Sequence, residues 1–430
     1  GMMLCGCVAA EILGYINVKD ATKMIHGALS SLAKMEKFNG HPYNWYDIVT
    51  LKPLRPLFVS TADNGNLACC LVAVRQAIEG YKPCVTDPDV IVMLNESLNI
   101  IRSVLRDMDF SMLYDSKKDL FSVGYDVQEQ RLSEYAYDMF ASEARQASFY
   151  ALIAGQAPIK HWRRLSRIVV KRNGRYILKS WSGSMFEYLM PALLMRTYDK
   201  TLWSNAFNGI IGEQIRYAGK AKRPWGISES GYWLFDSEKY YQYKAFGIPY
   251  AAVRYTKTEE YVAAPYATAL ALEFAPYAAA KNLIRLKNMG MCSRFGFYEA
   301  VDMSGETKNI IKSHMAHHEG MSLIAAANCL KKDCIVDLFH SAPEVKAGEI
   351  LLQEKLPDVI QPDAAPRKTT DKAPDIYVRN IEESFSGITG RPHCAMLTNG
   401  SLSMVVSNSG ANVSFAGDIM LNKWKSDAVS

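Results

Sequence analysis

The sequence lacks the motifs of several common protein classes. No apolar run reaches the ~18 residues that a membrane-spanning helix needs, because Glu, Lys or Gly interrupts every long candidate. There is no GxxxxGK[ST], GxGxxG or GxSxG pattern, which excludes the usual phosphate loop, dinucleotide fingerprint and nucleophile elbow. The excess of 49 Lys and Arg over 44 Asp and Glu is small and spread along the chain. Nucleic acid is therefore a poor first candidate for a partner.

The cysteines do not have the pattern of a disulfide framework. They number nine, an odd count, no CxxC pair occurs, and Cys69, Cys70 and Cys329 lie in apolar helical patterns. We interpret them as reduced thiols of a cytoplasmic protein. Cys5-Gly-Cys7 alone is weak evidence for redox or metal chemistry. The first residues lack the basic flank of a signal peptide, so secretion is not expected.

Apolar and aromatic residues are plentiful. Of the 430 residues, 49% are hydrophobic and 22% are charged, so the chain can bury a large core. Aromatic residues make up 11%, with 24 Tyr and 7 Trp, and many stand beside small or polar residues. This pattern suits a cleft that stacks on sugar rings, although a large helical core also uses many aromatic side chains.

Apolar residues at helical spacing dominate residues 1–356. The pattern predicts helices over 20–38, 65–81, 86–109, 128–155, 185–196, 201–222, 265–289, 315–331 and 343–354. Asp20 would cap the first of them, and a single clear hairpin is expected over 167–180, turning at Asn173-Gly174. The most economical fold class is mainly α, an (α/α)6 toroid of paired helices, although periodicity alone does not fix its closure.

The composition changes after Leu356. Three prolines fall in a charged stretch without periodicity, so residues 357–375 are predicted to be a linker. Beyond it, residues 393–398, 401–406 and 413–415 have strand patterns separated by Asn-Gly and Asn-Ser-Gly turns. So few strands do not make an independent sandwich. We expect residues 1–356 to form the helical domain and 376–430 to be the incomplete start of a β-sandwich.

Four segments place a carboxylate beside aromatic residues and glycine. Glu143 lies in a predicted helix, where its i±4 neighbours Met139 and Ala147 are apolar. Such a carboxylate is either paired inside the protein, for example with Arg145, or it points into a cavity. Glu187 falls in the first turn of the next helix, where a capping role competes equally with a catalytic one.

The other two carboxylates lie in loop patterns. Glu229 stands between Trp225-Gly226 and Ser230 in a segment without a strong helix or strand pattern, which makes it the best single site candidate. Glu299 follows the motif FGFY, with Asp302 just beyond. Two carboxylates facing each other across a cleft are the minimum for glycoside chemistry, because one protonates the leaving oxygen and the other attacks or activates water.

Other candidates would contact sugar rather than react with it. They are polar or aromatic side chains in Gly-rich or Pro-rich surroundings: Trp45, Asp47, Asp63, Asn64, Asn66, Trp181, Trp225 and Tyr266. Each of these alone is more often structural. His314, His317 and His318 precede Glu319, but the HExxH arrangement and a suitably spaced Cys or Asp are missing. We expect no metal and no cofactor, and favour helix-end contacts or a substrate hydrogen bond from His317.

Taken in order, these segments resemble the glycoamylase-like domain of cyclic β-1,2-glucan synthases. The matching motifs are 44–47 (NWYD), 59–68 (VSTADNGNLA), 141–145 (ASEAR), 180–191 (SWSGSMFEYLMP), 225–230 (WGISES), 241–243 (YQY), 264–268 (APYAT) and 315–321 (MAHHEGM). They cover about residues 8–356. The tail motifs 397–400 (LTNG), 407–410 (SNSG) and 424–427 (WKSD) are similar to the opening of the β-sandwich in those synthases.

The resemblance implies an (α/α)6 barrel that acts on β-1,2-glucan and is related to endo-β-1,2-glucanases. It implies Glu143 as acid/base and Glu229 as nucleophile, with Glu187 as a third carboxylate that could replace either. Glu299 and His317 are expected among the substrate-binding residues. One member of the catalytic pair should occupy an apolar or like-charged setting that raises its pKa.

Three functions remain open from the sequence. The first is an enzyme on β-1,2-glucan, either a transglycosylase that closes linear glucan into a ring or an endo-hydrolase. The alternatives are a non-catalytic glucan-binding remnant of a larger synthase and a helical scaffold protein. Because the chain has no segment like the membrane-embedded glycosyltransferase of the synthases, the partners expected are β-1,2-glucan and the remaining modules of a synthase.

Overall fold

The computed structural model describes residues 1–236, 239–253, 260–357, 360, 394–399, 401–408, 411–417 and 419–422. Contacts divide the chain into two units, Gly1–Thr369 and Thr370–Ser430, each of which is described by itself. The predicted linker over 357–375 lies outside the described residues, apart from positions 357 and 360. None of the described helices combines the length and the hydropathy that a membrane crossing requires.

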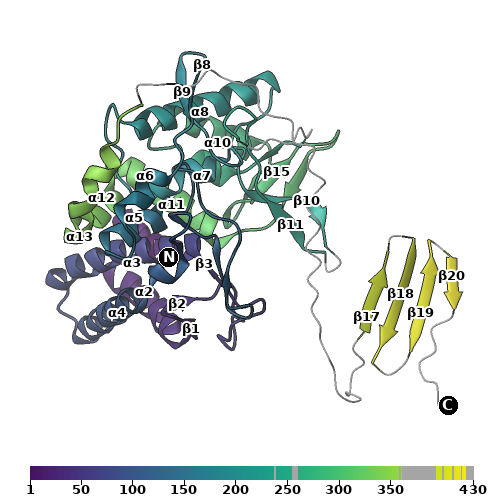
Figure 1. Cartoon of the computed structure of the whole chain (residues 1–430), viewed down its shortest axis with the longest axis horizontal. Coiled ribbons are helices and arrows are strands. Elements are labelled where there is room, and N and C mark those ends of the chain that lie inside the picture. Colours follow the sequence, from purple (N-terminus) through teal and green to yellow (C-terminus); the bar gives the residue numbers. More distant parts are fainter. Residues whose placement is uncertain are drawn as a thin grey trace. The chain divides into compact units, whose positions relative to one another are not determined.

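Helices are the main regular structure of the first unit (Figure 1). They are α1 (Met2–Ile12), α2 (Val18–Lys34), α3 (Thr61–Tyr81), α4 (Pro88–Asp107), α5 (Arg145–Ile153), α6 (Ile159–Arg164), α7 (Met185–Leu189), α8 (Leu202–Lys220), α9 (Pro265–Ala269), α10 (Pro276–Asn288), α11 (Ala316–Leu330), α12 (Cys334–Ser341) and α13 (Pro343–Gly348). The expected helix-rich character is confirmed. The closure of helix pairs into a toroid stays a prediction.

Some of these helices are buried on most sides, whereas others cover them. α3 is buried along most of its length and packs against α1, α4, α5 and α12. α1 also packs on α11. α2 and α4 pack on each other and bury one face, which includes Ile25, Leu29, Leu94 and Ile101. One buried face is what the helical spacing of apolar residues predicts for a helix at the surface.

Short antiparallel strands connect the helices. They are β1 (Lys37–Phe38), β2 (His41–Pro42), β3 (Phe58–Ser60), β4 (Tyr114–Asp115), β5 (Leu120–Phe121), β6 (Gly124–Asp126), β7 (Arg131–Leu132), β8 (Val169–Arg172), β9 (Arg175–Leu178), β10 (Ser230–Phe235), β11 (Tyr241–Lys244), β12 (Val262–Ala263), β13 (Cys292–Ser293), β14 (Gly296–Phe297), β15 (Ala300–Asp302) and β16 (Asn309–Ile311). β3, β6 and β7 form one sheet and β12, β15 and β16 another. In Figure 1, β10, β11 and β15 lie together at one side of the helices.

The hairpin predicted over 167–180 is confirmed as β8–β9. Asn173 and Gly174 turn it with φ angles of 49° and 75°, the left-handed conformation that this kind of turn requires. The expectation of a single hairpin is wrong, since β1–β2, β4–β5, β10–β11 and β13–β14 also pair as hairpins. Most of these strands have only two to four residues, too few for a period-two pattern to stand out in the sequence.

The predicted helix over 128–155 is wrong for most of its length. Only α5 is helical, and the preceding residues form β7 and isolated bridges from Met139 to Ser166 and from Ala141 to Ser180. Contacts with distant parts of the chain therefore override the local helical spacing. The Asp20 cap is also wrong, because Asn17 caps α2 and its Oδ1 accepts the Asp20 N–H over 2.9 Å.

Proline and glycine shorten three other predicted helices. The one over 185–196 ends as α7 before Pro191, and the one over 265–289 divides into α9 and α10, which begins at Pro276. A proline supplies no N–H to a helix interior, so it is tolerated only in the first turn. The helix predicted over 343–354 is α13, which ends at Gly348 and continues as a 3-10 turn.

The second unit contains the expected C-terminal strands. β17 (Cys394–Thr398), β18 (Leu402–Ser407), β19 (Asn412–Ala416) and β20 (Ile419–Asn422) pair in sequence order as an antiparallel meander. Among its described residues, only Ser407, Ala411 and Val413 are buried. Their assignment as the incomplete start of a β-sandwich stays a prediction.

Candidate active site

Glu143 lies in the turn before α5 and not within a helix, because α5 begins only at Arg145. Ser142 Oγ donates a hydrogen bond to Glu143 Oε2 over 3.2 Å. Removal from water and then the negative charge of Glu187 raise the pKa of Glu143 to about 8. A carboxyl group with this pKa is still protonated at neutral pH, as a general acid must be. The predicted rise in the pKa of one carboxylate is thus confirmed.

The proposed pairing of Glu143 with Arg145 is not what the structure shows. The guanidinium of Arg145 instead lies over the ring of Trp203, with its central carbon 3.4 Å from the ring centroid. This stacking is a cation–π contact in the buried core. Glu143 therefore keeps its carboxyl group available to the site.

Glu187 is held by a dense set of hydrogen bonds at the start of α7. It forms a capping box with Ser184, whose hydroxyl and N–H both donate to Glu187 Oε2 over 2.9 Å. The hydroxyls of Ser180 and Ser182 donate to the same oxygen over 2.9 and 2.6 Å, and the Ser182 N–H donates to Oε1 over 3.1 Å. These donors fix Glu187 in a capping role, while its charge acts on Glu143.

Glu229 follows a tight loop that depends on a glycine. Gly226 has a φ of 113°, and a Cβ there would lie 2.7 Å from Thr268 Oγ1 and 2.8 Å from the carbonyl oxygen of Ala264. Only glycine adopts this conformation and fits this space. The Trp-Gly pair of the motif therefore brings the chain close to α9 and delivers Glu229 to the start of β10.

Several charges act on Glu229. Burial raises its pKa, and a hydrogen bond from the Tyr243 hydroxyl and the charge of His318 oppose that rise. The charges of Glu187 and Asp63 raise the pKa further. Four neighbours thus act on Glu229. Tyr243 and His318 favour its ionised form, and Glu187 and Asp63 disfavour it.

Tyr137 shows that these acids face one site. Its pKa is raised by removal from water and then by the charges of Glu143, Asp63 and Glu229, and it hydrogen-bonds Glu143. These three carboxylates, from separate parts of the chain, therefore lie near one phenol. We call Glu143, Glu187, Glu229 and Asp63 the carboxylate cluster.

A cavity of about 510 Å³ adjoins this cluster at Asp63. Its lining includes several predicted substrate-binding residues: Asp63, Asn64, Asn66 and His317. Asn66 Oδ1 has no hydrogen-bond partner among the described residues. Withdrawal from water and the charge of His318 lower the pKa of His317, so its ring is neutral. Neutral polar groups in a cavity of this size suit sugar hydroxyls.

Glu299, Tyr266 and His318 form a buried group next to Glu229. Glu299 Oε2 lies 2.8 Å from His318 Nδ1, and the Tyr266 ring stacks on the imidazole with centroids 3.6 Å apart. The Tyr266 hydroxyl donates to the carbonyl oxygen of Glu229 over 2.7 Å. Glu299, a predicted binding residue, therefore contacts His318 beside Glu229. Tyr266, another predicted binding residue, contacts the Glu229 backbone.

Other predicted sugar contacts lie outside the cluster. Trp225 is buried, and its backbone N–H donates to Asn282 Oδ1 over 3.2 Å. Asp47 closes a local turn by accepting the N–H groups of the two residues at 49 and 50. Trp45 and Trp181 are partly exposed, and Trp181 Nε1 donates to Asp138 over 2.7 Å. Sugar contacts from these four residues stay predictions.

Sequence reasoning gave no role to Tyr137, Tyr243 or His318. The available signal for Tyr243 was the strand-forming composition of 230–235 and 241–244, which pairs Gly231 with Tyr243 and returns this tyrosine to Glu229. His318 was considered only as part of a possible metal motif. Among the described residues, no three His, Cys, Asp or Glu side chains gather closely enough to hold a metal ion.

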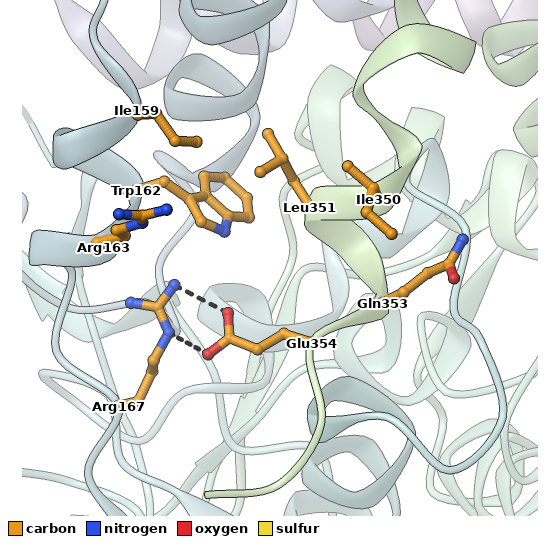
Figure 2. Close-up of a pocket in the computed structure, with 8 residues that line it drawn as sticks. All are labelled: Ile159, Trp162, Arg163, Arg167, Ile350, Leu351, Gln353 and Glu354. Carbon is orange, nitrogen blue, oxygen red and sulfur yellow. Dashed lines mark hydrogen bonds and ion pairs between the residues drawn. The ribbon is translucent and has the colours of Figure 1, made fainter.

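A separate cavity of about 450 Å³ contains no member of the carboxylate cluster. Figure 2 shows Trp162, Ile159 and Leu351 around the open space, with Arg167 paired to Glu354 at one edge. Arg167 Nη2 donates to Glu354 Oε2 over 3.0 Å. Glu354, the single acid in the lining of this cavity, is thus paired with Arg167. The cavity therefore does not offer a pair of reactive carboxylates.

Comparison with known proteins identifies what the chain is similar to. Residues 134–343 match the family model Glycoamylase, described as putative glucoamylase. The curated cyclic beta-(1,2)-glucan synthase NdvB of Rhizobium meliloti (strain 1021) is 27% identical over 554 aligned positions, which cover 100% of this chain and 20% of that protein. The chain thus spans about a fifth of the length of this relative. The resemblance to glycoamylase-like domains of cyclic β-1,2-glucan synthases is confirmed.

Solved structures share the fold. The endo-beta-1,2-glucanase from Chitinophaga pinensis, in complex with sophorotriose and glucose, has a TM-score of 0.65 at 16% identity and covers 81% of this chain and 85% of its own. A putative glucoamylase from Bacteroides caccae has a TM-score of 0.64 at 17% identity, with 81% and 86% covered. At these identities the likeness establishes a common fold.

Proposed function

We propose that this chain, with its glycoamylase-like domain over residues 134–343, acts on β-1,2-glucan by two-carboxylate glycoside chemistry. Glu143 is the general acid/base and Glu229 is the nucleophile. The observation that carries this proposal is the burial of Glu143 near the charges of Glu187 and Glu229, which raises its pKa to about 8. One protonated and one ionisable carboxyl group in one site is the required combination.

In the first step, Glu143 gives its proton to the glycosidic oxygen while Glu229 attacks the anomeric carbon. The C–O bond to the leaving sugar breaks, and a covalent glycosyl ester forms on Glu229. Glu143 is then ionised and accepts the proton of an incoming hydroxyl group, which attacks the ester and releases Glu229. If the hydroxyl belongs to water the outcome is hydrolysis, and if it belongs to a sugar the outcome is transfer.

We favour transfer, including closure of a linear glucan into a ring. The substrate follows from the relatives, since the curated one is named a cyclic beta-(1,2)-glucan synthase and a fold neighbour is named an endo-beta-1,2-glucanase. The Asp63 cavity, with its neutral amide and imidazole groups, offers room for the acceptor end of the chain. The remaining modules of a synthase are the proposed partners, and the unpaired cysteines fit a reducing, cytoplasmic compartment.

The test is incubation with linear β-1,2-glucan, with products followed by mass spectrometry and their anomeric configuration by NMR. Cyclic or lengthened products with retained β configuration are expected. Shorter reducing products would replace transfer with hydrolysis, and inverted products would remove the glycosyl ester from the mechanism. Glucan that binds but is never cleaved would overturn the enzymatic proposal.

Two variants separate the site from general effects of burial. Glu229→Gln should abolish turnover and leave the melting temperature largely unchanged. Glu273→Gln is the matched control, because burial and Asp333 raise the pKa of Glu273 to about 8 as well, yet Glu273 is not in the carboxylate cluster. This control should keep its activity. Equal loss of activity in both variants would contradict the assignment of the site.

A further inference from the structure

A chain of side chains leads from the buried Glu299 to the proposed nucleophile. Glu299 Oε2 lies 2.8 Å from Nδ1 of His318, and Nε2 of the same ring lies 3.4 Å from the hydroxyl of Tyr243. The Tyr243 hydroxyl in turn hydrogen-bonds the carboxylate of Glu229. The four residues come from separate segments, since Glu299 precedes β15, His318 lies in α11, Tyr243 in β11 and Glu229 before β10.

We propose that Glu299 and His318 act as positioning residues that direct the Tyr243 hydroxyl proton at Glu229 and so keep this carboxylate ionised. The inference rests on the proposed role of Glu229 as nucleophile. It concerns residues that need not touch the reacting atoms. Glu299 would then serve the site from within the protein and not, as first expected, by binding substrate.

The donor and acceptor rules give the chain its direction. With Glu299 ionised, its oxygen can only accept, so His318 Nδ1 carries a proton. If Nε2 were bare, it would compete with Glu229 for the single proton of Tyr243. If Nε2 also carries a proton, the imidazolium donates to Glu299 and Tyr243, and Tyr243 donates to Glu229. With Glu229 ionised, only this second arrangement satisfies every contact in the chain.

Because the chain is buried, each of its donors and acceptors needs a partner within the protein. The side chains of His318 and Glu299 are 4% and 1% exposed, so water cannot replace a missing partner. A buried imidazolium is tolerable because Glu299 stands against it as a charge partner.

The surrounding contacts hold the chain in place. The Tyr266 ring stacks on His318 with an interplanar angle of 8°, and its hydroxyl reaches the backbone carbonyl of Glu229. Glu299 Oε1 accepts the N–H of Gly231, two residues beyond Glu229, over 3.1 Å. Glu299 and Tyr266 therefore tie His318 to the same stretch of backbone that carries Glu229.

Other titratable groups around Glu229 act in the opposite direction. Glu187 in α7 and Asp63 in α3 raise its pKa, and burial raises it most. Tyr243 in β11 and His318 in α11 are the groups that favour the ionised form. Without the chain, Glu229 would keep its proton to higher pH and could not attack.

The first measurement tests the protonation of His318 and needs no substrate. Nitrogen-15 NMR of labelled histidine in the full chain, with His318→Gln to assign the signal, should show both ring nitrogens of His318 protonated near pH 7. Glu299→Gln should remove one of these protons. A neutral His318 ring in the unaltered protein would overturn the proposal.

The second measurement is the pH profile of kcat/KM on β-1,2-glucan. In Tyr243→Phe and His318→Gln, the acidic limb should move up by about one pH unit, which is about a tenfold loss below that limb. Tyr266→Phe is the matched control, because it removes a buried hydroxyl that contacts the Glu229 backbone and not its carboxylate. Its acidic limb should stay in place whatever its maximal rate.

The outcomes separate this proposal from the proposed function. Turnover with an unmoved acidic limb in both Tyr243→Phe and His318→Gln would overturn the chain and leave the function standing. No turnover by the unaltered protein would remove the function, while the NMR result would still decide the protonation of His318. If His318→Gln fails to fold, Tyr243→Phe carries the test because it keeps the ring.

Discussion

Three glutamates of one chain differ in their surroundings, and those surroundings divide their roles. Glu187 accepts five hydrogen bonds from three serines, four of them on Oε2, and these bonds hold it at the start of α7. Glu143 receives hydrogen bonds from the hydroxyls of Ser142 and Tyr137 and faces two like charges. Glu229 has a phenol and an imidazole beside it. These different neighbours are the basis of the roles proposed for the three glutamates, as cap, acid and nucleophile.

Replacing Glu143 by Gln should lower kcat/KM on β-1,2-glucan by about 10²- to 10⁴-fold, because the leaving oxygen then receives no proton. An aryl β-glucoside whose leaving group needs no proton should recover most of the first step in this variant. The unaltered enzyme should lose activity as the pH rises through about 8, where Glu143 gives up its proton. Equal losses on both substrates would show that Glu143 is not the acid.

The same substitution should change stability in the opposite direction. Below pH 4.5 the Glu143 carboxyl is protonated in the folded and the unfolded chain alike, and between 4.5 and about 8 only the unfolded chain ionises. The unaltered protein therefore loses free energy of unfolding as the pH rises through this window, whereas Glu143→Gln does not. Urea unfolding at pH 5 and pH 8.5 measures this difference. At the higher pH the free energy of unfolding of the variant should gain about 1–3 kcal/mol relative to the unaltered protein, after allowance for partial exposure.

Glu187→Gln should move the alkaline limb of the pH profile to lower pH. The negative charge of Glu187 helps to hold the proton on Glu143, so its removal lets that proton leave earlier. Ser182→Ala is the matched control, because it removes one donor to Glu187 and keeps the charge. Its alkaline limb should stay in place. A limb that moves equally in both variants would trace the effect to disturbed structure instead of charge.

The sequence was sufficient to propose Glu143, Glu187 and Glu229 as candidates, and the family resemblance supplied the roles proposed for them. It was not sufficient to arrange them. The relation of Glu187 to Glu143 depends on α7 and the turn before α5, more than forty positions apart in the printed numbering. The role of His318 depends on a stacking contact with Tyr266 that no local pattern encodes.

At the scale of elements, the long amphipathic helices were predictable and the segments near the site were not. α2, α4 and α8 follow from one-sided apolar spacing. The stretch before Glu143 has apolar residues at similar spacing, but it pairs with distant backbone at Ser166 and Ser180. Those pairings join residues that are distant in the sequence, so the periodicity within the stretch does not predict them.

The contact of α3 with α5 sets the position of Glu143 and can be tested with two glycines of one helix. At Gly65 a Cβ would lie 2.2 Å from the Ala147 Cβ of α5, so Gly65→Ala should push the helices apart and cost about 1–3 kcal/mol. At Gly80 nothing lies within 4 Å, so Gly80→Ala should stabilise α3 by about 0.5–1 kcal/mol. Urea unfolding measures both changes.

The activity of the two variants distinguishes an effect on the packing of α3 against α5 from an effect on the helix propensity of α3. Because α5 begins two residues after Glu143, a displaced α5 should also reduce kcat in Gly65→Ala. Gly80→Ala should retain the unaltered rate. A Gly65→Ala protein as stable and active as Gly80→Ala would mean that α3 and α5 do not pack as closely as the structure places them.

At the scale of the whole molecule, the two units differ in how much each can bury. The first has an extensive core that joins its helices and its short sheets. The described strands of the second leave large apolar side chains in water, with Met396 and Leu397 each 62% exposed and Ile419 69% exposed. A four-stranded meander with so little buried surface lacks the packing that independent stability requires.

Separate expression of the two units should therefore give opposite results. Residues 1–369 should unfold cooperatively on heating and keep the turnover of the full chain, because the carboxylate cluster and its cavity lie within them. Residues 370–430 alone should show no cooperative transition by calorimetry, since the chain entropy of ordering them exceeds what their burial returns. A sharp transition in the second fragment would contradict this, and loss of turnover in the first would show that the C-terminal residues contribute to the site.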